Sequence, residues 1–173
     1  MQLQDNKLLK ISASALFAVF AAICGILEGM LPLHLLIPIP GVKLGIANIF
    51  IIFAFKIIGA SYALAISVAR TALVFIFTGN SMGLILSLFG ATMSYISLCI
   101  MIKFHGKAFT YIGISALSAV FHGIGQLAGA YIFIGGSVTY YLPVMLIACT
   151  ITGIFTGTLM NISENKISSR FKV

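Results

Sequence analysis

Charged residues are scarce in this sequence. Only 8% of the 173 residues are charged, and only three are acidic, Asp5, Glu28 and Glu164. A soluble globular domain carries about 25% charged residues. Because 61% of the residues are hydrophobic, the sequence predicts an all-α integral membrane protein, with one membrane domain over residues 1–173.

The sequence also lacks the motifs that mark several kinds of functional site. Cys24, Cys99 and Cys149 lie singly in apolar runs with no CxxC spacing, which argues against a disulfide framework or a zinc site. No GxxxxGK[ST] phosphate loop occurs, so an ATP-driven step would belong to another subunit. The basic residues are scattered at the ends of apolar runs, which does not favour a nucleic-acid partner. We therefore expect neither a metal nor a cofactor.

Six apolar runs are long enough to be read as helices. They cover residues 8–30, 44–58, 60–78, 82–103, 109–134 and 140–161, and the second is short. We interpret them as six membrane-spanning helices. The joint at residues 31–43 is apolar and holds three of the four prolines, so we expect it to lie against the membrane or to fold inward as a lid.

The basic residues predict an orientation. With six spans both termini share a side, and that side collects eight basic residues: Lys7, Lys10, Lys56, Lys103, Lys107, Lys166, Arg170 and Lys172. The other side has Lys43 alone. The positive-inside rule then predicts a multi-pass protein of the cell membrane with both termini in the cytoplasm.

The fifth run carries an unexpected polar face. At about 100° per residue, Ser115, Ser118, His122, Gln126 and Gly129 fall on one stripe of a helix. Hydrocarbon offers none of these side chains a hydrogen-bond partner. They either bond to neighbouring helices, for about 0.6 kcal/mol each on average, or line a wet cavity.

Arg70 lies midway along the third run. An arginine at a helix centre costs about 2.5–3.5 kcal/mol on insertion scales. An ion pair with Glu28, a bound anion or a water-filled pocket would offset that cost.

The outer start of the second run, "PGVKLGIAN", places Lys43 in the first helical turn and Asn48 about one turn deeper. A helix N-terminus beside a lysine favours an anion. The alternative is that Lys43 anchors at the lipid headgroups.

Six polar residues lie at a similar depth along their predicted helices. The candidates at the outer end or middle of their runs are Glu28, Asn48, Arg70, Asn80, His122 and Gln126. They predict a pocket that opens outward under the lid. Because its cations outnumber its one acid, we expect a ligand with an anionic group.

Small residues recur every four positions in the first run, at Ser14, Ala18 and Ala22. Such a stripe lets another helix approach closely. It serves either packing inside the bundle or the docking of a separate membrane subunit.

Four segments together resemble a family: "PGVKLGIAN", "SVARTALVF", "HGIGQL" and "YYLP". They are similar to the Gx transporters, also labelled heptaprenyl diphosphate synthase component I, over roughly residues 10–160. That family resembles the S components of energy-coupling-factor (ECF) transporters. The resemblance implies a six-helix ECF S-component-like bundle with an outward vitamin-binding pocket, a lid in the first outer loop, and a coupling subunit that docks on Ala18 and Ala22. Tyr140, in "YYLP", completes the expected ligand-binding set.

The small number of acidic residues argues against the enzyme activity that the synthase label implies. Prenyl-chain enzymes of that class hold magnesium on paired aspartate-rich motifs, and magnesium prefers carboxylate and phosphate oxygens. No two of the three acids here are close in sequence, so we do not expect an enzyme. The preferred hypothesis is a substrate-binding subunit that works in the lipid bilayer with an ECF coupling subunit and ATPases. The alternatives are a non-catalytic membrane partner of isoprenoid or quinone biosynthesis, and a stand-alone proton-coupled carrier.

Overall fold

The computed structural model describes residues 6–31, 42–106 and 109–170, all of them in helices and the turns between helices. The helices are α1 (Lys7–Met30), α2 (Asn48–Ile57), α3 (Ala60–Thr78), α4 (Ser81–Met101), α5 (Tyr111–Ile134) and α6 (Leu142–Arg170). Two short 3₁₀ helices, η2 (Ile102–Phe104) and η3 (Gly136–Tyr141), follow α4 and α5. The prediction of an all-α protein is confirmed for these residues.

Local sequence explains where the helices begin and end. The side chains of Asn6, Asn80 and Thr110 cap α1, α4 and α5 by accepting hydrogen bonds from backbone N–H groups of the first turn. Pro143 stands in the first turn of α6, where the missing N–H would have no helical partner. Gly79 ends α3 with φ of 64°, a left-handed conformation that glycine adopts without steric cost.

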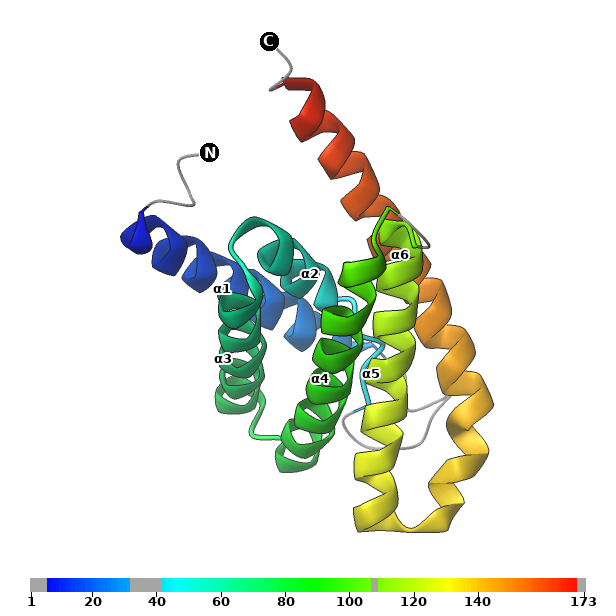
Figure 1. Ribbon diagram of the computed structural model, residues 1–173. Coiled ribbons are helices and arrows are strands. Elements are labelled where there is room, and N and C mark those ends of the chain that lie inside the picture. Colours follow the sequence, from blue (N-terminus) through cyan, green and yellow to red (C-terminus); the bar gives the residue numbers. More distant parts are fainter. Residues whose placement is uncertain (1–5, 32–41, 107–108, 171–173) are drawn as a thin grey trace.

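The helices run alternately up and down (Figure 1). The start of α1, the α2–α3 junction, the α4–α5 junction and the end of α6 lie at one end of the molecule, and the α3–α4 and α5–α6 junctions lie at the opposite end. Lys7, Lys56 and Lys103 therefore share one end, as the charge pattern predicted. Which side of a membrane that end faces stays a prediction.

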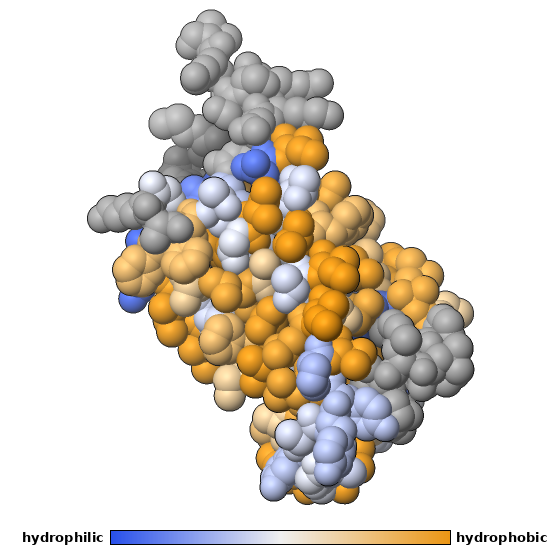
Figure 2. Space-filling view, turned by 90° about the vertical axis from the view of Figure 1, so that its right-hand side faces the viewer, coloured by the Kyte–Doolittle hydropathy of each residue, from blue (hydrophilic) through white to orange (hydrophobic). Residues whose placement is uncertain are grey.

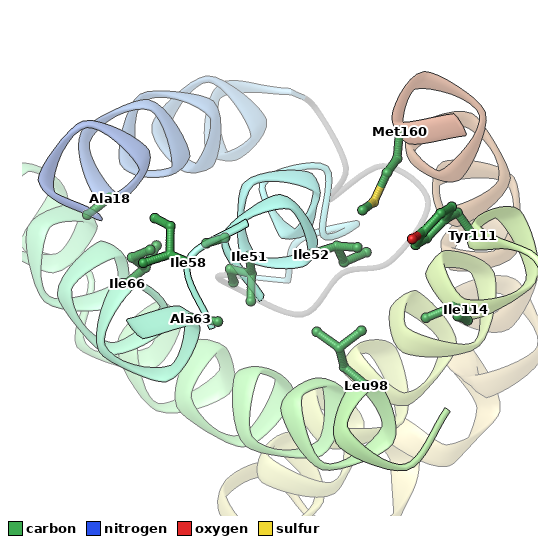
Figure 3. Packing of buried hydrophobic residues seen from close by; sticks show 11 residues of the cluster. Ala18, Ile51, Ile52, Ile58, Ala63, Ile66, Leu98, Tyr111, Ile114 and Met160 are labelled. Carbon is green, nitrogen blue, oxygen red and sulfur yellow. The ribbon is translucent and has the colours of Figure 1, made fainter. Parts of the chain in front are cut away.

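The short helix α2 lies at the centre of the bundle, between α1, α6 and the α3–α5 wall (Figure 3). Its Ile51, Ile52 and Ala54 are buried and form a cluster with Ile66 of α3 and Leu98 of α4. At about 25 cal/mol for each Å² of apolar surface removed from water, buried side chains of this size each contribute roughly 1.5–3 kcal/mol in an aqueous reference. Packing on all sides holds α2 in place although it has only ten residues.

Five of the described helical segments are long and apolar enough to cross a membrane. The middle of the face in Figure 2 is mostly hydrophobic, and hydrophilic residues lie toward both its upper and its lower end. The exception is α2, which spans only about 15 Å at 1.5 Å per residue, against a hydrocarbon core of about 30 Å. The structure thus supports a multi-pass membrane protein but does not confirm the sixth span predicted at 44–58, where the helix Asn48–Ile57 has only ten residues.

Two boundaries differ from the predictions for a physical reason. The second helix begins at Asn48 and not at residue 44, because Gly45 has φ of 89° and interrupts helical geometry. Lys43 consequently precedes the helix and does not stand in its first turn. The sixth helix begins at Leu142 after η3 and continues to Arg170, beyond the predicted end at residue 161. Most of the predicted lid, residues 32–41, lies outside the described residues.

Labelling of single cysteines tests the arrangement of α5 across a membrane. On a background without Cys24, Cys99 and Cys149, we expect Lys103→Cys and Ser137→Cys to react with an impermeant maleimide from opposite sides. The reason is that α5, with 24 residues, separates them by about 36 Å. Only the Ser137→Cys variant should label in intact cells. Labelling of both positions from the same side would contradict the fold.

Candidate functional site

A chain of buried polar side chains joins four helices. Arg70 of α3 donates from Nη1 to Asn48 Oδ1 at the start of α2 (3.3 Å). Asn48 Nδ2 in turn donates to Ser94 Oγ of α4 (3.3 Å). Ser94 Oγ lies 2.8 Å from Ser118 Oγ of α5. All four side chains are buried, so each bond satisfies polar atoms that would otherwise lack a hydrogen-bond partner in the interior. The predicted polar face of α5 is therefore directed into the protein.

The Glu28 carboxylate holds the connection between α1 and α2. Its Oε1 accepts hydrogen bonds from the backbone N–H of Gly45 (2.5 Å) and of Ile46 (3.3 Å). The positive φ of Gly45 turns these N–H groups toward α1. A Cβ at Gly45 would also meet the His122 ring at 3.3 Å, so only glycine fits. These two backbone N–H groups before the second helix are therefore already bonded to Glu28, and the predicted anion site at Lys43 stays a prediction.

Gln126 joins the same connection to α5. Its Oε1 accepts the backbone N–H of Lys43 (3.0 Å), and its Nε2 lies 2.7 Å from His122 Nε2. Because the amide nitrogen can only donate, His122 Nε2 accepts and the ring proton sits on Nδ1. Both side chains are fully buried and pack over Gly90 of α4, where any Cβ would approach them to 2.9 Å.

Three of these buried groups keep hydrogen-bonding atoms without a partner among the described residues. They are Glu28 Oε2, His122 Nδ1, and the Nε and Nη2 atoms of Arg70. Glu28 and Arg70 attract each other electrostatically, although the side-chain hydrogen bond that Arg70 makes among the described residues goes to Asn48. Unpaired buried polar atoms are unusual in folded proteins and call for an explanation such as a water, an ion or a ligand.

A cavity of about 530 Å³ adjoins this network. Its wall comes from the last turns of α1 and α3, the first turns of α4, and the start of the connection that resumes at Val42. Buried lining residues are Gly25, Val42, Lys43, Thr71, Val74, Gly83 and Ser87, whereas Met30, Phe77, Thr78 and Asn80 are exposed at its rim. The volume is in the range of small-molecule sites, about 300–1,000 Å³.

The structure divides the predicted ligand-binding residues into groups. Lys43 and Asn80 line the cavity. Glu28, Asn48, Arg70, His122 and Gln126 do not line it and form the buried network beside it. Tyr140 is 85% exposed on η3 and belongs to neither. The single pocket predicted from depth is therefore a cavity and a network that meet at Lys43, and a role in ligand binding stays a prediction for each residue.

The small-residue stripe of α1 faces into the protein. Ala18 and Ala22 are buried, and Ala18 belongs to the cluster around α2 and α3 (Figure 3). Ser14 is half-buried and donates its hydroxyl to the carbonyl of Lys10 in its own helix. This packing supports the interpretation of the stripe as an internal contact. Subunit docking at these residues stays a prediction.

Sequence reasoning missed the polar residues that α4 contributes. Ser87 lines the cavity, and its buried hydroxyl has no partner among the described residues. Ser94 joins the network seven residues later. Two helical turns separate them, so both lie on one face together with Gly90. That spacing was readable in "SLFGATMS", but serine is common in membrane helices and gave no specific signal.

Removing the amide of Gln126 should destabilise the protein. Gln126→Leu leaves the Lys43 N–H and His122 Nε2 without partners in a buried site, so we expect the free energy of unfolding to fall by about 1–3 kcal/mol. Thermal unfolding in detergent measures this. Thr158→Ala is the matched control, because Thr158 is exposed and bonds only to its own helix. Equal melting temperatures for the two variants would contradict the network.

Together these features define a multi-pass helical membrane protein with a small-molecule-sized cavity beside a buried polar network. The chain belongs to the family described as heptaprenyl diphosphate synthase component I, which it matches over residues 17–162. The family recognised from four sequence segments is thereby confirmed. No curated protein and no solved structure matches the chain.

Proposed function

We propose that this protein is a substrate-binding membrane subunit for the transport of a small anionic molecule, working with an ECF-type coupling subunit and ATPases. The observation that carries the proposal is the cavity, because it combines a buried lysine with a hydrophobic wall and an exposed rim at one end of the helices. A binding site at the end of a helical bundle fits a protein that receives its ligand from one side of a membrane.

The buried network supplies the rigidity that such a site needs. It fixes residues 43–48 to α1 through Glu28, to α3 through Arg70 and to α5 through Gln126. Lys43 lies in this fixed segment and lines the cavity, so the backbone that carries its side chain is held in place. Preorganised groups bind more tightly because less conformational entropy is lost on binding.

A catalytic role has little support from the residues. Glu28 is the acid at the network, and one of its oxygens already accepts two backbone N–H groups. The other two acids of the sequence, Asp5 and Glu164, stand near the two termini. Coordination of a magnesium diphosphate favours several carboxylates together. We therefore propose a non-catalytic protein.

A second candidate follows from the family's name. A protein called component I of a synthase implies a second component, so this chain is alternatively a non-catalytic membrane partner of a prenyl diphosphate synthase. In that case the cavity would hold a substrate or product of the partner enzyme. The two functions differ in what copurifies with the chain.

Purification from native membranes in a mild detergent separates these functions. The proposal predicts a stable complex with a membrane coupling protein and an ATPase pair, and ATP-dependent uptake by that complex in liposomes. A complex with a soluble prenyl synthase would overturn it in favour of the second candidate. Uptake by the purified chain alone in liposomes would overturn it in favour of a proton-coupled carrier.

A further inference from the structure

We infer that the cavity between α1, α3 and α4 binds an amphipathic monoanion, with its single negative group deep in the cavity at Lys43 and Ser87 and its apolar body directed toward the rim. This inference rests on the proposed function and names the ligand class of the same site.

The charge balance around the cavity indicates one negative charge. The network and cavity contain two cations, Lys43 and Arg70, and one acid, Glu28. Glu28 and Arg70 are both fully buried and attract each other. Lys43 lines the cavity, and its ammonium has no hydrogen-bond partner among the described residues. One positive charge is thus left over, and it faces the cavity.

The deep end of the cavity also offers neutral hydrogen-bonding groups. Ser87 lines the cavity and is 2% exposed, and its hydroxyl, which can rotate, has no partner among the described residues. Thr71 lines the same region, although its hydroxyl already donates to Ser67 O. A carboxylate or similar anion beside Lys43 would satisfy the Ser87 hydroxyl as well, since a carboxylate accepts several hydrogen bonds.

The remaining wall is apolar. Ile26 of α1, Val74 and Phe75 of α3 and Leu84 of α4 line the cavity between its buried end and its exposed rim. A ligand that is charged throughout would leave this surface in contact with polar atoms, which is unfavourable. An aliphatic or aromatic body attached to the anion covers it.

The protonation of Lys43 gives the site a pH dependence. Burial lowers the pKa of the Lys43 ammonium to about 8, the charge of Arg70 acts in the same direction, and Glu28 opposes both. Among the described residues, His122 also interacts electrostatically with Lys43. Because the ammonium is charged below pH 8 and neutral above it, anion binding should weaken as the pH rises from about 7 to 9.

The test uses the absence of tryptophan from this chain. Phe75→Trp places a single tryptophan in the cavity wall, and Phe155→Trp places one on an exposed part of α6 that does not line the cavity. In phosphatidylcholine nanodiscs, emission is titrated with octanoate, octanamide and acetate. Octanoate and octanamide have the same chain and nearly the same shape but differ in charge, and octanoate and acetate carry the same charge but differ in the apolar body.

We expect octanoate to change the emission of Phe75→Trp saturably and that of Phe155→Trp only by non-saturable partitioning into lipid. Octanamide and acetate should bind at least about tenfold more weakly, the loss expected when a charge-assisted hydrogen bond or an apolar chain is removed. Adding Lys43→Gln should abolish the preference for octanoate over octanamide. Lys43→Arg should keep that preference and extend it to pH 9, because arginine stays charged.

Equal affinities for octanoate and octanamide, or an unchanged preference in Lys43→Gln, would overturn the inference while leaving the cavity as a binding site and the proposed function intact. No saturable response to any probe would place the ligand elsewhere and overturn the inference. Repeating the titration with phosphatidylglycerol nanodiscs distinguishes two sources of the same chemistry. Competition there would assign the site to an anionic lipid, and unchanged affinity would assign it to a free anion.

Discussion

Arg70→Leu is expected to lower the free energy of unfolding by about 1–3 kcal/mol, the usual cost of leaving a buried hydrogen-bonding atom without its partner. The change leaves the buried Glu28 carboxylate without a nearby Arg70 cation and Asn48 Oδ1 without its donor. Reversible thermal or denaturant unfolding in detergent measures the loss.

A double-mutant cycle separates the charge effect from lost packing. Glu28→Gln keeps an amide oxygen that can accept the N–H groups of Gly45 and Ile46. The double variant should therefore be more stable than Arg70→Leu alone, with a coupling energy of about 1–3 kcal/mol. Additive losses would mean that Arg70 and Glu28 do not compensate each other's charge.

Gly153→Leu is expected to disrupt the contact between α5 and α6. A Cβ at Gly153 would lie 2.6 Å from Ala116 Cα and 2.9 Å from Ser115 O, both backbone atoms of α5. The two helices must separate to admit a side chain, which costs about 3 kcal/mol, the upper end of the usual range for overpacking. Thermal unfolding in detergent measures the loss of stability.

Gly29→Leu is the matched control for Gly153→Leu. A Cβ at Gly29 meets no atom of the described residues within 4 Å, and replacing a helical glycine raises helix propensity by about 1 kcal/mol or less. We expect unchanged or slightly higher stability. If both variants melt at the same temperature, α5 and α6 are not packed as closely as described.

Periodicity in the sequence was sufficient to predict most helices and the inward polar face of α5. Apolar runs of about 20 residues predict membrane helices, and the spacing from Ser115 to Gln126 predicts one face of a helix. These signals depend only on local geometry, which is why they agree with the structure.

The start of α2 could not be predicted because it depends on a distant side chain. Residues 44–47 are apolar or small and continue the run that follows. Their conformation is set by the bonds from Gly45 and Ile46 to Glu28, seventeen and eighteen residues earlier. No local pattern records such a contact.

Which of the candidate residues line the cavity could not be predicted for a similar reason. Depth along a helix indicates the level of a residue but not the neighbours that it faces. Arg70 and Thr71 lie at nearly the same depth in α3, but about 100° apart around its axis. Thr71 lines the cavity, whereas Arg70 turns toward Asn48 and the network.

Native mass spectrometry of the gently purified chain is the most direct test of ligand binding in the cavity. If the cavity is a ligand site, the wild-type chain should retain a small molecule that carries one negative charge, and Lys43→Gln should lose it while staying folded and monodisperse. The same mass retained by Lys43→Gln, or a chain that carries no small molecule but binds a soluble prenyl synthase, would contradict the account.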